Sequence, residues 1–236
     1  MIAVIGGTGL ENLNGARIID THDYSNTPYG AASSTVKEVE FNNKRFYFLS
    51  RHREDHSIPP HKVNYHANIW ALKDLGVDAI ITVAAVGGIT NCCVPGKVII
   101  PDQIIDYTWG REHTFFDGPA VEHIDFSNPY DCELRNRIVN LDLDLVVDGT
   151  YGATQGPRLE TAAEIKRMQQ DGCDIVGMTG MPEASLAREL GLDFVCCAIS
   201  ANWAAGISDQ PITMQEIIDN VSIGVETVKT ILSQAL

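Results

Sequence analysis

The sequence predicts an α/β fold built on a mixed β-sheet. Short β-branched runs alternate along the chain with longer segments of helical period, which is typical of layered α/β proteins. Two of the runs are separated only by a tight turn, so at least one pair of strands is antiparallel. The 236 residues, 44% of them hydrophobic, are enough for a sizeable core, and we expect one domain over residues 1–236.

Eight runs that are rich in β-branched and aromatic residues predict strands. The run at Val36–Phe41 is followed by Asn42-Asn43, which favours a tight turn, so the next run is expected to return beside it as a hairpin. The predicted strands are Ile2–Ile5, Val36–Phe41, Arg45–Leu49, Ala79–Val83, Val98–Ile100, Val146–Val147, Asp174–Val176 and Phe194–Ile199.

Three segments predict helices. The first runs from Val63 to Leu75 and is followed by Gly76, a typical residue after a helix end. The other two open on a capping box, a threonine with a glutamate three residues later. These pairs are Thr161 with Glu164 and Thr213 with Glu216. The last helix has an apolar stripe that would bury one face: Ile217, Val221, Val225, Val228 and Leu232.

The charge balance and the cysteines limit the partners and the compartment. A formal net charge of −14 repels nucleic-acid phosphates and anionic membranes, so we expect neither as a partner. The six cysteines form no C-x-x-C pair, which favours reduced, buried thiols. The chain opens on an apolar strand without the features of a secretion signal, and no apolar run reaches the ~18 residues of a membrane span. We therefore expect a soluble, cytoplasmic protein.

Two segments in the first quarter of the chain are candidates for binding an anion. The GGTG segment at residues 6–9 lets backbone N–H groups approach a ligand, although a tight turn explains it as well. It does not continue as G-x-G-x-x-G, so it does not predict a dinucleotide site. In the SRH segment at residues 50–52, Arg51 offers a planar donor fork and His52 can donate a hydrogen bond beside it. A solvated surface arginine is the ordinary alternative.

Three later segments also place polar side chains at strand ends. Glu160 precedes a helix, where it can accept hydrogen bonds from a ligand or interact with the positive helix end. Thr179 can offer a hydroxyl and an N–H to an anion, and Met178 is either an apolar contact or ordinary core. Asn202 ends an apolar strand, where α/β sheets form ligand crevices, although a turn residue also fits there.

The sequence favours neither a metal site nor a serine hydrolase. Four histidines recur at His52, His56, His61 and His66, but Pro59-Pro60 breaks any helix that would align them. No H-E-x-x-H motif or Cys/His ligand spacing is present, so we expect no metal. The G-x-S-x-G motif of serine hydrolases is absent as well.

The order and wording of these segments are similar to those of one family. GGTGL, SRH, KVNYHANIWALK, TQGPRLET, GMTGMPEASLA and SAN together resemble the purine nucleoside phosphorylase and methylthioadenosine phosphorylase family, nearly from end to end. Within it, the chain looks closest to the members that act on S-methyl-5'-thioinosine. The resemblance implies a three-layer αβα arrangement around a central mixed sheet. It also implies a homotrimer with active sites at the subunit interfaces.

The resemblance further implies a reaction and the residues that carry it. Phosphorolysis converts a nucleoside and inorganic phosphate into a free base and a ribose 1-phosphate, without a metal, another cofactor or a covalent intermediate. Phosphate would lie against Gly7, Thr8, Arg51, His52, Ala85 and Thr179. The nucleoside would contact Met178, Leu159 and Val86, while Asn202 and Glu160 would act on the base.

Three departures from the family pattern bear on this assignment. Ala84 stands where the family often has threonine, so one phosphate contact is expected to be lost. Arg53 replaces a common glycine after the Arg-His pair and can supply charge instead. Adenine-specific members carry a serine at the position of Glu160 and aspartates at Asn202 and Ala204.

The last departure favours a 6-oxopurine base. Such a base presents an N1–H donor and an O6 acceptor, whereas a 6-aminopurine presents an N1 acceptor and an N6 donor. Glu160 can accept from N1–H, and the amide of Asn202 can donate to O6 or to N7. A mismatched base would leave buried polar groups unpaired.

The 5' end of the nucleoside is defined less sharply. Phosphorylases of ordinary nucleosides commonly bind the 5'-hydroxyl with a late histidine, and no histidine follows His123. Met214 and Ile217 would instead suit an apolar methylthio group. By resemblance, His123 would reach this pocket from the neighbouring subunit.

Four alternatives remain open at this point. Two are an inosine or guanosine phosphorylase and a methylthioadenosine phosphorylase. A third, given Ala84, is a nucleoside-binding protein with little catalysis. The fourth is a hydrolase that uses water, which would leave Arg51 and His52 without a purpose.

Overall fold

The computed structural model describes residues 1–10, 13, 15–119 and 121–236. Its strands form one 11-stranded mixed sheet. They are β1 (Ile2–Gly6), β2 (Arg17–His22), β3 (Val36–Phe41), β4 (Lys44–Ser50), β5 (Ala79–Gly88), β6 (Val98–Ile100), β7 (Gln103–Asp106), β8 (Leu145–Val147), β9 (Thr150–Ala153), β10 (Ile175–Gly177) and β11 (Asp193–Trp203). The helices are α1 (Tyr65–Asp74), α2 (Glu133–Val139), α3 (Ala162–Gln170), α4 (Gly180–Glu189) and α5 (Met214–Ala235), with a 3₁₀ turn at Pro60–Lys62.

The α/β class and the mixed sheet are confirmed. The strand order is β2-β3-β4-β1-β5-β10-β9-β7, with β11 paired to β5 and β6, and β8 paired to β6. β1 runs parallel to both β4 and β5, while β3 and β4 form the expected antiparallel hairpin. Asn42 and Asn43 make its turn with φ of 48° and 62°, the left-handed values that a two-residue hairpin of this kind requires.

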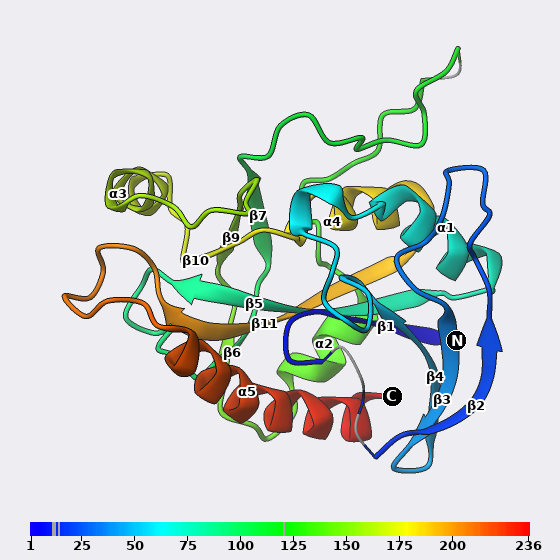
Figure 1. Ribbon diagram of the computed structural model, residues 1–236, viewed down its shortest axis with the longest axis horizontal. Helices are drawn as coiled ribbons and strands as arrows, with labels where there is room; N and C mark the ends of the chain where they lie inside the picture. Colours follow the sequence, from blue (N-terminus) through cyan, green and yellow to red (C-terminus); the bar gives the residue numbers. More distant parts are fainter. Residues whose placement is uncertain (11–12, 14, 120) are drawn as a thin grey trace.

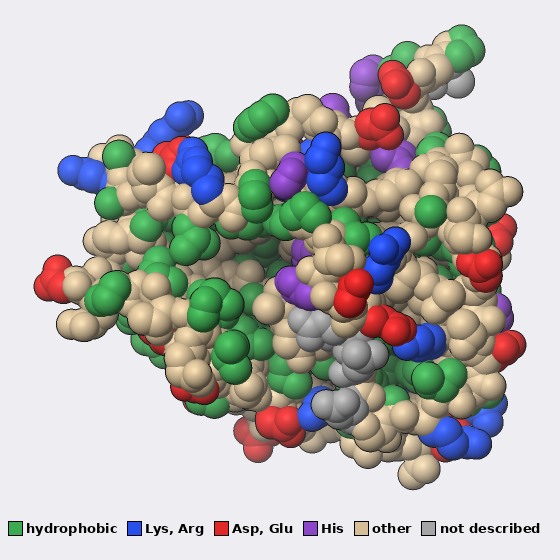
Figure 2. Space-filling model, viewed as in Figure 1, with side chains coloured by type: hydrophobic (Ala, Val, Ile, Leu, Met, Phe, Trp, Pro, Cys, Tyr) green, Lys and Arg blue, Asp and Glu red, His purple; other side chains and the backbone are tan. Residues whose placement is uncertain are grey.

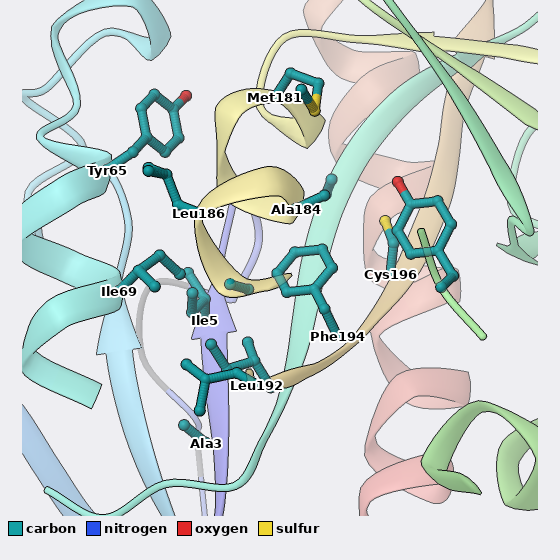
Figure 3. Packing of buried hydrophobic residues seen from close by; sticks show 14 of the residues in the cluster. Ala3, Ile5, Tyr65, Ile69, Met181, Ala184, Leu186, Leu192, Phe194 and Cys196 are labelled. Carbon is teal, nitrogen blue, oxygen red and sulfur yellow. The ribbon is translucent and has the colours of Figure 1, made fainter. Parts of the chain in front are cut away.

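Helices cover both faces of the sheet, as Figure 1 shows for α1 and α4 on one side and α2 and α5 on the other. Alternate residues of each central strand face the two layers. In β1, Ala3 and Ile5 join the core under α1 and α4, whereas Val4 joins the core under α2 and α5. Figure 3 shows the first core, where Ile69 of α1 and Leu186 of α4 meet side chains of the sheet. The three-layer αβα arrangement is therefore present.

The predicted helix starts are set by side-chain caps. Asn64 accepts a hydrogen bond from the backbone N–H of Ala67, so α1 begins at Tyr65 instead of Val63. The Thr161 capping box of α3 forms in full, and the Thr213 side chain caps α5 through the N–H of Glu216. None of the described helices combines the length and the apolar character needed to cross a membrane.

Several elements were missed or given the wrong length. β2, β7, β9 and α2 were not predicted, and β5 continues five residues beyond Val83 to Gly88. β2 is largely exposed, so it lacks the alternating burial pattern of a half-buried strand. β7 and β9 have only four residues each and are held by pairing with each other. Such pairing depends on tertiary contacts that a local pattern does not contain.

The topology brings strand ends together over the second half of β5. β1 runs parallel to both β4 and β5, and β11 runs parallel to β5. The carboxyl ends of these strands therefore meet at one edge of the sheet. β10 runs antiparallel to β5 and pairs Val176 with Gly87, so its carboxyl end points back toward the middle of that strand. β9 follows β10 in parallel. Segments that leave the sheet in opposite directions therefore converge near Val86.

Candidate active site

A cavity of about 240 Å³ lies where these strand ends converge. The face drawn in Figure 2 is hollowed near its centre, where hydrophobic side chains and histidines gather. Residues from all five candidate segments line the cavity. They include Thr8, Arg51, His52, Leu159, Glu160, Met178, Thr179 and Asn202, together with Ala84, Ala85, Val86 and Ala204. One site therefore unites residues as far apart in the chain as Thr8 and Ile217.

Arg51 is buried beside the cavity and holds its guanidinium against a carboxylate. Nε and Nη2 donate to the two oxygens of Glu183 at 2.7 and 2.9 Å, and both side chains are 1% exposed. Thr82 on β5 accepts from Nη2 and donates to Glu183. Burial lowers the pKa of Arg51, but the charge and hydrogen bonds of Glu183 outweigh it, so the pKa stays above its ordinary value. This ion pair joins the end of β4 to β5 and to the start of α4.

The donor fork that the sequence assigned to phosphate is therefore directed at Glu183. Nη1 donates to the carbonyl oxygen of Val83 at 3.0 Å, so four of the five N–H groups of Arg51 are used inside the protein. Gly7 lies against Nη1, because a Cβ at residue 7 would stand only 2.6 Å from that nitrogen. The pair as a whole carries no net charge, so an anion here depends mainly on hydrogen bonds.

The ring of His52 is fixed by the backbone. Nδ1 lies 2.8 Å from the carbonyl oxygen of Ile58, which can only accept, so Nδ1 carries the proton. Burial, the charge of Arg51 and the neighbouring ring of His56 lower the pKa of His52 to about 4. The ring is therefore neutral near pH 7. Its N–H, which the sequence assigned to a ligand, is committed to Ile58.

Two threonines and a backbone turn supply further donors to the cavity. Thr8 lies within the GGTG segment at the end of β1, and Thr179 is the residue before α4. The backbone of Met181 is extended, with φ of −121° and ψ of 141°, so the regular turns of α4 begin only after that residue. Ala84 and Ala85 lie on β5 in the lining. A methyl group at residue 84 offers no hydrogen bond, as the sequence indicated.

Glu160 is oriented by a neighbouring hydroxyl. Thr154, directly after β9, donates to Glu160 Oε1 at 2.6 Å. Its hydroxyl also lies 3.3 Å from the carbonyl oxygen of Gly177 at the end of β10. The carboxylate borders a second cavity on its other side, lined by Trp109 and Arg158 among others. Thr154 thus holds Glu160 at the boundary between the two cavities.

Asn202 is directed by an irregularity in β11. Ser200 pairs with Val86 but Asn202 pairs with Gly87, so the strand has one extra residue at Ala201. Such bulges turn a side chain away from the regular alternation. Asn220 of α5 donates to the carbonyl oxygen of Ala201 at 2.9 Å and supports the bulge. The Asn202 amide donates to the Trp203 carbonyl oxygen at 2.7 Å, which leaves one N–H for another acceptor.

Some of the predicted site residues do not line the cavity. Gly7 contacts Arg51 but is not part of the lining. Met214 is 68% exposed and outside the lining, whereas Ile217, in the first turn of the same helix, does line the cavity. His123 is exposed on the long segment between β7 and α2, the green extension in Figure 1. It does not contact this cavity of its own chain.

Several residues of the site were not predicted from the sequence. The lining also includes His56, Pro60 and Ile212, and the structural support of Arg51 comes from Thr82 and Glu183. Glu183 lies in the GMTGMPEASLA segment. A carboxylate among the apolar residues of that helix start is the feature of the sequence that could have indicated its role. Among the described residues, no group of three or more His, Cys, Asp or Glu side chains is placed to hold a metal ion.

The model of the Phosphorylase superfamily matches residues 1–236. A protein of Xanthomonas campestris, named a probable S-methyl-5'-thioinosine phosphorylase, is 52% identical over 93% of this chain and 90% of its own. The 6-oxopurine nucleoside phosphorylase of Pyrococcus furiosus is 44% identical over 92% and 85%. The solved methylthioadenosine phosphorylase of Schistosoma mansoni with adenine has a TM-score of 0.91 at 31% identity, covering 99% and 90% of the two chains.

Replacement of Glu183 by glutamine tests the buried ion pair. Glu183→Gln keeps the shape of the side chain but leaves the Arg51 charge buried without a counter-charge. We expect the free energy of unfolding to fall by roughly 3–5 kcal/mol in urea denaturation. The control is Glu226→Gln, which removes the same charge from an exposed pair with Lys229 and should cost less than about 1 kcal/mol. Equal losses in the two variants would contradict this role of Glu183.

The pH dependence of stability tests the neutral state of His52. The unfolded chain binds a proton at this residue near about pH 6.5, whereas the folded chain does so only near pH 4. Between these values the unfolded state holds more protons, so the contribution of His52 to stability is full above about pH 6.5 and is lost as the pH falls. The stability difference between wild type and His52→Gln should therefore shrink from about pH 7.5 to about pH 5. A constant difference between wild type and His52→Gln over this pH range would contradict the lowered pKa of His52.

Proposed function

Because this chain belongs to the Phosphorylase superfamily, we propose that it is an enzyme that cleaves a 6-oxopurine nucleoside with inorganic phosphate. S-methyl-5'-thioinosine is the proposed substrate, and the products are hypoxanthine and S-methyl-5-thioribose 1-phosphate. The observation that carries the proposal is the pair Glu160 and Asn202 in one cavity with Thr8, His52 and Thr179. The first two can bind the base, and the last three offer polar groups to phosphate.

The proposed recognition of the base follows from the hydrogen-bond donors and acceptors of Glu160 and Asn202. Glu160 accepts from Thr154 at one oxygen, and the other oxygen can accept from the N1–H of a 6-oxopurine. Asn202 has one N–H beyond its bond to Trp203, and this can donate to O6 or N7. A 6-aminopurine would place the lone pair of N1 against the carboxylate. The geometry therefore supports hypoxanthine over adenine as the leaving base.

The proposed reaction exchanges one bond at ribose C1'. The bond from C1' to N9 breaks with its electrons moving to the purine, while a phosphate oxygen bonds to C1'. The proton that the phosphate gives up passes to the purine, which leaves as neutral hypoxanthine. The sugar passes through a state resembling an oxocarbenium ion, which the adjacent phosphate charge stabilises. The amide of Asn202 stabilises the departing base as N7 gains electron density. Met178 in the lining would support the ribose, next to Val86 and Leu159.

We propose the 5' substituent of the nucleoside from the apolar residues that line the cavity. Ile212 and Ile217 lie there, and neither can hydrogen-bond a 5'-hydroxyl. The names of two relatives differ in the 5' substituent that they imply. The protein of Xanthomonas campestris is named for methylthioinosine, and the protein of Pyrococcus furiosus is named for 6-oxopurine nucleosides. The lower identity to the second relative and the two isoleucines favour the methylthio group. A general 6-oxopurine nucleoside phosphorylase is the second candidate.

We also propose the homotrimer that the family resemblance implies. His123 lies on an extended, exposed segment and is absent from the cavity of its own chain. This placement supports a role in the cavity of a neighbouring subunit. The side of the cavity near Ile217 would then be completed only in the assembly.

Base release from three nucleosides tests the proposed function. Methylthioinosine, inosine and methylthioadenosine are each incubated with the enzyme, with and without phosphate, and the free base is measured. We expect release to require phosphate and kcat/KM to decrease in the order in which the substrates are named. Release that does not depend on phosphate would indicate a hydrolase. Faster cleavage of methylthioadenosine would contradict the proposed roles of Glu160 and Asn202.

The variant Asn202→Asp tests the base contact separately. A carboxylate at residue 202 repels O6 and cannot donate to N7, so kcat/KM for methylthioinosine should fall by roughly 10- to 100-fold. The ratio of methylthioadenosine to methylthioinosine cleavage should rise. Asn136→Asp adds the same charge at an exposed site of α2 and is the control. An unchanged ratio in Asn202→Asp would show that this side chain does not contact the base.

A further inference from the structure

One guanidinium group, that of Arg111 in the segment after β7, holds three separate stretches of the chain. Its Nη2 donates to the backbone carbonyl oxygens of Thr154 and Gln155 at 3.2 and 2.9 Å, and its Nε donates to the Gln155 side chain at 3.1 Å. Nη1 donates to the carbonyl oxygen of Met181 at 2.5 Å. The group also lies over the ring of Tyr65, 5.5 Å from its centroid. Arg111 therefore joins the loop after β9 to α1 and α4.

Two of these contacts fix Arg111 to the core. Tyr65 of α1 and Met181 of α4 are 3% and 7% exposed, and both belong to the core that Figure 3 shows. Nη1 of Arg111 also lies 3.4 Å from the hydroxyl oxygen of Tyr65. Because close-packed side chains have little room to move, the guanidinium group has a fixed position from which it holds the loop.

The loop that carries Glu160 has little other backbone support. It opens at Thr154, whose N–H bonds to the end of β10 at 2.8 Å, and it closes at the cap of α3 on Thr161. Within the part of the chain that the structure describes, no backbone–backbone hydrogen bond reaches residues 155–160. The bonds from Arg111 therefore satisfy carbonyl groups that no other backbone group holds.

Thr154 connects this support to the carboxylate of Glu160. Its backbone carbonyl accepts from Arg111, and its hydroxyl donates to Glu160 Oε1 at 2.6 Å. A shift of Thr154 would therefore displace the carboxylate, and a misplacement of about 1 Å can cost a factor of about 100 in rate. A planar guanidinium group can serve several oxygens at once, whereas the ammonium of lysine is a compact charge.

We propose that Arg111 is a positioning residue for Glu160, which acts through Thr154 and so sets the preference for a 6-oxopurine base. The inference rests on the proposed function, in which Glu160 accepts from the N1–H of the base. Arg111 does not line the cavity of its own chain, so its effect is transmitted through the loop. Its loss should impair a substrate that uses the contact with Glu160 and spare one that does not. Methylthioadenosine has no N1–H and serves as that second substrate.

Arg111→Lys tests this role while the charge is retained. We expect kcat/KM for methylthioinosine to fall by roughly 10- to 100-fold and that for methylthioadenosine to change much less, so their ratio shifts. The matched control is Arg135→Lys, because Arg135 also donates to two backbone carbonyl groups, those of Ile100 and Pro101, but does not line the cavity. The control should leave the ratio unchanged even where it lowers stability. An unchanged ratio in Arg111→Lys would overturn the proposal.

Rescue by guanidinium ion keeps the test valid for an unstable variant. Arg111→Ala removes the side chain, and guanidinium at millimolar concentration should restore the wild-type ratio of the two substrates. Ammonium at the same concentration should not restore it. Equal rescue by both ions, or rescue that raises both activities by the same factor, would show a merely structural role and overturn the proposal.

A double-mutant cycle with Glu160→Ala shows whether Arg111 acts through Glu160. In a chain without the Glu160 carboxylate, Arg111→Lys should cost little further activity toward methylthioinosine. An equal loss in both backgrounds would overturn the inference and leave the proposed function intact. Base release that is unchanged in Glu160→Ala would contradict the proposed function and the inference with it, so the two failures are distinguishable.

Discussion

The buried ion pair between Arg51 and Glu183 is the constraint on which the rest of the site depends. It joins the end of β4 to the start of α4 through Thr82 of β5, at a point where both charges are shielded from water. Removal of two charges from water is costly, so the pair persists only because its geometry is bidentate and further hydrogen bonds complete it. Among the described residues that line the cavity, Arg51 is the arginine, and Glu183 already neutralises it. An anion bound there would therefore be held by hydrogen bonds from neighbouring groups.

The sheet topology explains why a single cavity can contact both ends of a nucleoside. Strands that run in opposite directions end over the second half of β5, so segments from the first and last thirds of the chain become neighbours. The bulge at Ala201 then turns Asn202 to the cavity, and Thr154 fixes Glu160 at its border. The placement of the polar groups in the cavity thus depends on backbone irregularities at strand ends as much as on the identity of the side chains.

The sequence alone predicted the fold class, the hairpin, both threonine caps and the five segments of the cavity. These features succeed because local patterns or quoted motifs carry them: Asn42-Asn43 requires a tight turn, and Thr161 with Glu164 forms a cap. The partners of Arg51 and His52 were not predicted, since Glu183 and the Ile58 carbonyl reach them only through tertiary structure. β2 was missed because its exposed residues lack a burial pattern. Met214 is 68% exposed and does not line the cavity within one chain.

The transfer of a sugar from a purine to phosphate in this cavity can be observed directly by phosphorus NMR. The enzyme is incubated with methylthioinosine and inorganic phosphate while hypoxanthine is followed in the same sample. A new sugar phosphate signal should grow in equal amount with hypoxanthine, as inorganic phosphate declines. Hypoxanthine that accumulates without a new phosphate ester would contradict phosphorolysis in this cavity.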